Sequence, residues 1–141
     1  MKRIAFAAAL FAAPFASAVQ AGETPSPDGA EVYFIGLEDG AVLQNPVTLH
    51  FGLKGMGIAP AGYEVDDTGH HHLLINMSYE DLDPNESMPA TDTLIHFGGG
   101  QSETTRELPP GEHTIQLVLG DFGHVPHDPP VISDVITITV E

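Results

Sequence analysis

The residues best suited to chemistry in this sequence are its histidines. Seven of the eight lie in three groups, and an acidic residue directly follows the last of them. The candidate metal ligands are His70, His71, His72, His96, His113, His124, His127 and Asp128. Imidazole is the commonest protein ligand for borderline transition metals. The pattern therefore predicts a metal site.

The histidine triplet runs directly into an apolar stretch, residues 73–75. Because alternate residues of a strand share a face, His70 and His72 should point together and His71 should oppose them. At the end of a strand the chain can twist, so either set could be free to bind.

The predicted counterpart of the triplet lies further along the chain. His113 opens the strongest apolar strand, and His124 and His127 lie in a proline-containing loop after it. We predict that His71 or His72 binds a metal together with His113 and one ring of the loop. Asp121 or Asp128 could accept a hydrogen bond from a ligating ring and so fix its tautomer.

The residue types favour copper before zinc. The chain has no cysteine, so thiolate ligands, thiol catalysis and disulfides are all excluded. Imidazoles suit Cu(II) and Zn(II). Met56, Met77 and Met88 could supply thioether ligands for Cu(I), but methionines scattered in this way more often pack in a core. The predicted function is a metal carrier or buffer. The alternatives are a structural module with hydrogen-bonded histidines and a small metal-dependent oxidoreductase.

Motifs for other chemistries are weak or absent. There is no Gly-x-Ser-x-Gly sequence, and the glycines at 98–100 lack the lysine of a phosphate loop. Residues 81–86 place oxygen ligands at alternate positions, but they lack the turn glycine of a calcium loop. The ordered histidine pattern of copper-zinc superoxide dismutase is missing as well. The sequence leaves open whether the protein is an enzyme.

The first residues have the features of a secretory signal peptide. A basic start precedes an apolar stretch and small residues, which predicts cleavage after Ala21, or alternatively after Ala18. We predict a signal peptide over 1–21, a flexible leader over 22–29 and one domain over 30–141. The expected location is the periplasm or the exterior.

The charge of the predicted exported form is strongly negative. Its 20 acidic residues are opposed only by Lys54 and Arg106, so its formal charge is 2 − 20 = −18. Such a charge disfavours nucleic acid and anionic membrane surfaces as partners and favours cations. We expect no membrane insertion once the signal peptide is removed, and the sequence identifies no protein partner.

The expected fold is all-β. Short alternating segments separated by turn residues predict about seven strands, arranged as a small immunoglobulin-like β-sandwich, with a closed barrel as the alternative. The expected strands cover residues 32–35, 42–43, 47–53, 69–77, 93–97, 104–108, 113–119 and 131–140. Alternation over 47–53 places His50 on the solvent face, so it is left out of the site.

Three segments carry a family resemblance. They are the stretches that begin at Thr68-Gly69-His70, at His96-Phe97-Gly98 and at Pro109-Pro110-Gly111. Together they resemble a bacterial exported family known only as a domain of unknown function, of the DUF4399 type, and the resemblance covers about Ala30 to Glu141. It implies one compact exported domain that contains the same histidines, and it implies no particular activity.

Overall fold

A computed structural model describes residues 24–141 of the 141-residue chain. The elements are β1 (Glu31–Phe34), β2 (Ala41–Leu43), β3 (Val47–Lys54), β4 (Gly57–Ile58), β5 (Thr68–Ile75), a 3-10 turn (Tyr79–Asp81), β6 (Leu94–His96), β7 (Glu103–Arg106), β8 (Gly111–Gly120) and β9 (Ile136–Val140). Over this range no helix has the length and apolar character needed to cross a membrane.

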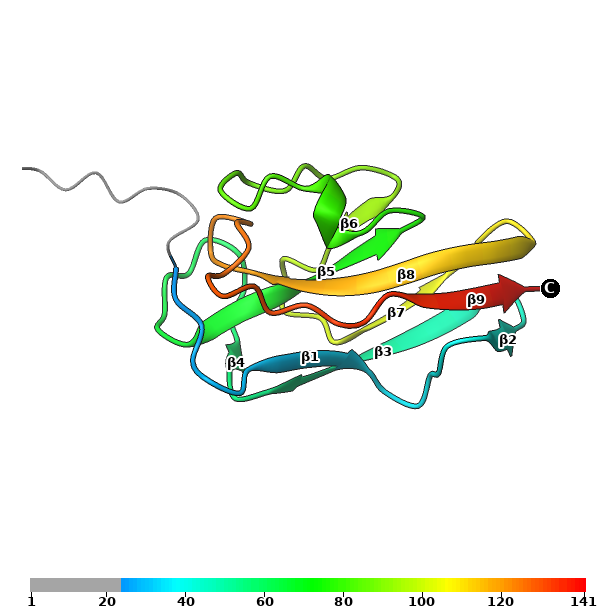
Figure 1. The fold of residues 1–141 in the computed structure, drawn as a ribbon, viewed down its shortest axis with the longest axis horizontal. Helices are drawn as coiled ribbons and strands as arrows, with labels where there is room; N and C mark the ends of the chain where they lie inside the picture. Colours follow the sequence, from blue (N-terminus) through cyan, green and yellow to red (C-terminus); the bar gives the residue numbers. More distant parts are fainter. Residues whose placement is uncertain (1–23) are drawn as a thin grey trace, which may run out of the picture.

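The strands form two sheets. The smaller has the order β1-β3-β7, and the larger has the order β2-β9-β8-β5-β4, with β6 also paired to β5. Figure 1 shows β1 and β3 beneath β8 and β9. Side chains from both sheets fill the space between these layers, including Phe51 from β3, Leu73 from β5 and Leu117 from β8. The predicted β-sandwich is confirmed.

The larger sheet is buried on both faces at β5. Residues 69–75 are all buried, so β5 is covered on its outer face as well as toward the core. The cover is the long loop between β5 and β6, which Figure 1 shows arching over β5 and β8. Met88 from this loop packs with Leu74, Leu94 and Val118 in a second apolar cluster. Polar groups on the outer face of β5 are therefore shielded from water.

The expected strands all have counterparts, with some shifts in their bounds. Residues 131–140 contribute a regular strand only over Ile136–Val140, because Val131 and Ile132 lie in an irregular stretch that meets β8 near Val118. The predicted signal peptide lies outside the described residues. Within the predicted leader, the backbones of Thr24 and Ser26 form hydrogen bonds with the backbone of Asp128.

Candidate metal centre

Strand alternation in β5 divides the histidine triplet as the sequence predicts. His71 points between the sheets, where its ring centroid lies 5.3 Å from that of Phe51. His70 and His72 share the opposite face with Leu74, and all three are fully buried. The candidate centre therefore lies on the covered outer face of the larger sheet.

The pairing of β5 with β8 brings the loop that follows β8 to this face. The two strands are antiparallel, with His70 opposite Gly120 and His72 opposite Val118. The start of β5 thus meets the end of β8. At Gly120 an added Cβ would lie 2.5 Å from Cε1 of His72 and 2.9 Å from Cε of Met88. The absence of a side chain at Gly120 is what leaves room for the His72 ring.

The loop after β8 is held by the carboxylate of Asp121. Its Oδ1 accepts hydrogen bonds from the backbone N–H groups of Gly123 (2.8 Å) and Val125 (2.9 Å). Between these residues His124 has a φ of 66°, a left-handed conformation that costs an L-residue about 1–2 kcal/mol. The His124 backbone is tied further, since its N–H donates to the Asp121 carbonyl and its own carbonyl accepts from Met88 N–H. The loop is therefore stabilised in a conformation that His124 would not favour alone.

Three imidazole nitrogens converge at this point. Nδ1 of His124 lies 2.9 Å from Nε2 of His70 and 3.2 Å from Nε2 of His72. One ring nitrogen from each residue lies within 4.8 Å of the other two. Nitrogens bound at about 2.0–2.1 Å to one tetrahedral ion lie roughly 3.3 Å apart. The two separations measured from His124 are close to this value, so the three rings could hold a transition-metal ion.

Hydrogen bonds alone leave several ring nitrogens of this cluster without a full partner. A neutral imidazole has one N–H and one lone pair, so Nδ1 of His124 cannot make a full bond to both facing nitrogens. The Nδ1 atoms of His70 and His72 are buried and have no hydrogen-bond partner among residues 24–141. In metal sites that second nitrogen usually donates to an oxygen. For His72 no such oxygen is present among the described residues, and its ring lies against Gly120.

His96 adds a fourth ring to the cluster. It pairs with His72 across β5 and β6, and its ring stacks on that of His124 with a centroid distance of 4.4 Å and an angle of 26°. Its Nε2 is buried and unpartnered within the described part of the chain. His96 therefore offers a further nitrogen beside the three that converge.

Burial keeps these rings neutral. Desolvation, followed by the nearby His124 and His96, lowers the pKa of His70 to about 4. Desolvation and then its three neighbouring rings lower the pKa of His72 to about 2. The pKa of His96 is also lowered, chiefly by burial. A metal binds the unprotonated ring, so at neutral pH His70, His72 and His96 need release no proton before binding.

The structure does not bring every candidate to the centre. His113 lies at the opposite end of β8, where Nε2 is 2.7 Å from the Pro109 carbonyl and Nδ1 is 3.0 Å from Nδ2 of Asn76. Our expectation that His113 joins the ligands does not hold. Both β5 and β8 begin near histidines, but antiparallel pairing places the start of one strand beside the end of the other.

Three further candidates also lie apart from the converging nitrogens. His71 is on the core side of β5. His127 is buried between the Leu119 and Thr68 carbonyls, which are 3.3 Å and 3.2 Å from its two ring nitrogens. Asp128 is exposed, and its backbone pairs with Thr24. Sequence reasoning missed the role of Gly120, for which the only signal is a glycine at the end of an apolar strand.

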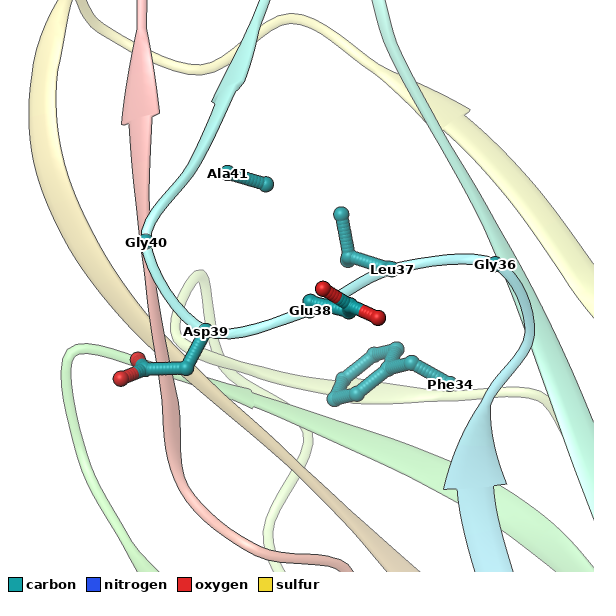
Figure 2. A pocket seen from close by; sticks show the side chains of 7 residues that line it. All are labelled: Phe34, Gly36, Leu37, Glu38, Asp39, Gly40 and Ala41. Carbon is teal, nitrogen blue, oxygen red and sulfur yellow. The ribbon is translucent and has the colours of Figure 1, made fainter.

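Two surface hollows in the described part of the chain have no histidine in their lining. One of about 670 Å³ lies beside β1 and β2, lined by residues 34 and 36–41. Figure 2 shows Phe34, Leu37 and Glu38 gathered there while Asp39 turns aside. Asp39 Oδ1 accepts a hydrogen bond from Thr137 N–H, so one oxygen of this carboxylate is engaged with β9. A second hollow, of about 260 Å³, lies over the loop containing Met88.

A family model matches residues 49–141, well over half of the chain, and its description is a domain of unknown function, DUF4399. The chain belongs to the DUF4399 family. The matched range contains all the imidazoles of the candidate centre, and the DUF4399 assignment itself brings no activity. No curated protein and no solved structure matches the chain.

Proposed function

We propose that this protein is an exported transition-metal-binding protein, of the carrier or buffer type, that binds copper in preference to zinc. The observation that carries the proposal is the convergence of His70 Nε2, His72 Nε2 and His124 Nδ1 at one partly buried point. The support for export to the periplasm or the exterior is the signal-peptide pattern at residues 1–21.

The ligand chemistry supports a borderline transition metal. Three imidazoles without a thiolate suit Cu(II) and Zn(II), and nitrogen sites generally bind copper more tightly than zinc. Three protein ligands leave a position open for a water or another molecule. The strongly negative chain would also attract cations.

The test is metal affinity of the processed protein, purified without a histidine tag. Cu(II) and Zn(II) should each bind with a stoichiometry near one, as measured by competition with a chelator. His72→Ala and His124→Ala should each weaken binding by about 100-fold or more, because each removes one of three ligands. His113→Ala is the matched control, since its ring lies at the other end of β8, and it should leave the affinity unchanged.

The second candidate is a structural histidine cluster without metal. Its support is that the separations of 2.9 Å and 3.2 Å are also hydrogen-bond lengths, and Nδ1 of His124 can make a full hydrogen bond to one of the two facing nitrogens. Wild-type protein that binds neither metal, or that binds equally well after both substitutions, would refute the metal centre and leave the hydrogen-bonded cluster.

A further inference from the structure

The start of the described chain lies against the loop that follows β8. Asp128 N–H donates to the Thr24 carbonyl at 3.0 Å, and Ser26 N–H donates to the Asp128 carbonyl at 3.2 Å. Ser26 Oγ also donates to the Pro129 carbonyl at 2.7 Å. Figure 1 shows the blue start of the described chain and the orange loop at the same end of the molecule. We call residues 24–26 the N-terminal clasp.

The N-terminal clasp reaches the candidate centre through one carboxylate. Thr24 Oγ1 donates to Asp121 Oδ2 at 2.7 Å. The other oxygen of Asp121 accepts the two backbone bonds, from Gly123 and Val125, that flank His124. Asp121 itself is buried, with 4% of its surface exposed. A side chain 97 positions away in sequence therefore anchors the group that shapes the His124 loop.

We propose that Thr24 is a positioning residue for the metal centre, so that docking of the N-terminal clasp and metal binding reinforce each other. This inference rests on the proposed function. His124 keeps its unfavourable backbone conformation only while the surrounding bonds hold it. If the clasp leaves, the Asp121 carboxylate loses one of three hydrogen bonds and can turn away from the loop. The fraction of molecules with His124 in place then falls, and the apparent affinity falls with it.

The coupling must also act in the other direction. A ligand that favours the docked loop stabilises the docked clasp by the same factor. Metal binding should therefore slow hydrogen exchange at the amides of Ser26 and Asp128, which make the bonds between the clasp and the loop. These amides do not contact the imidazoles, so slower exchange there would report coupling and not direct contact.

The experiment compares Thr24→Val with wild type, using protein expressed with its own residues 1–21 and recovered from the periplasm. Valine keeps the shape of threonine and removes the hydroxyl. Thr48→Val is the matched control, because Thr48 Oγ1 also makes one side-chain hydrogen bond, to Thr105 on the other sheet. Thr24→Ser retains the hydroxyl and serves as the rescue. Affinity for Cu(II) and Zn(II) is measured by chelator competition on protein shown to be folded by circular dichroism.

Thr24→Val should weaken metal binding by about threefold to tenfold. The reason is that losing one hydrogen bond to a carboxylate lowers the fraction of molecules in which the His124 loop is docked, and the apparent affinity falls with that fraction. Thr24→Ser and Thr48→Val should bind as wild type does. Equal affinity in Thr24→Val and wild type, or unchanged exchange at Ser26 and Asp128 on adding metal, would overturn the coupling while leaving the metal centre intact. A wild-type protein that binds no metal would instead overturn the proposed function and this inference with it.

Discussion

Acidification should destabilise the metal-free protein strongly between pH 7 and pH 5. His70, His71 and His72 are buried, and burial lowers their pKa values to about 4, 4 and 2, from an ordinary value of 6.5. In the unfolded chain the same rings take up protons below about pH 6.5. The unfolded state then binds more protons than the folded state, so the free energy of unfolding falls as the pH falls.

The size of the effect follows from the pKa differences. At pH 5 each ring is mostly protonated in the unfolded chain and mostly neutral in the folded chain. The free energy of unfolding is therefore lower than at pH 7 by about 2 kcal/mol for each ring. The three rings together should cost about 6 kcal/mol. The stability contributed by neutral burial is complete above about pH 6.5 and is lost progressively below it. A loss of this size is comparable to the whole stability of a typical domain.

The assay is urea unfolding of chelator-treated protein at several pH values, followed by circular dichroism. His72→Gln removes one titrating ring and should reduce the loss between pH 7 and pH 5 by about a third. Thr48→Val changes no titrating group and should keep the full loss. A fall of less than about 2 kcal/mol in wild type over this range would refute the reasoning, because it would mean that the three rings are not buried in neutral form.

Three further results are expected. Gly120→Ala should weaken metal binding and lower the free energy of unfolding by about 1–3 kcal/mol, as measured by chelator competition and urea unfolding, because its Cβ would overlap the His72 ring. His113→Gln should lower thermal stability by a few degrees yet leave metal affinity unchanged; a change in affinity would contradict its placement. Leu117→Ala should cost about 2–5 kcal/mol in urea unfolding, since Leu117 is fully buried between the sheets.

The sequence alone determined the local part of this fold. Alternation of apolar residues predicted the strands, because a half-buried strand repeats every two residues. The same rule separated His71 from His70 and His72, and the structure confirms that division. The sequence also indicates that the proline-containing segment after β8 could bring a distant histidine to the site.

Only the tertiary structure decided which distant residues meet. The register of β5 against β8 puts His70 beside Gly120 and leaves His113 at the far end, beside Ile138. Register follows from which side chains of two whole strands are buried together, and this is not encoded near any single histidine.

The shielding of the imidazoles also depends on tertiary structure. The loop over β5 buries His70 and His72, and the N-terminal clasp supports Asp121 across 97 positions. Sequence patterns report the conformation of neighbouring residues, whereas burial and long-range hydrogen bonds arise only when separate segments pack together. The sequence therefore determined the residue type and its strand positions, and packing brought His70, His72 and His124 together from among the candidates.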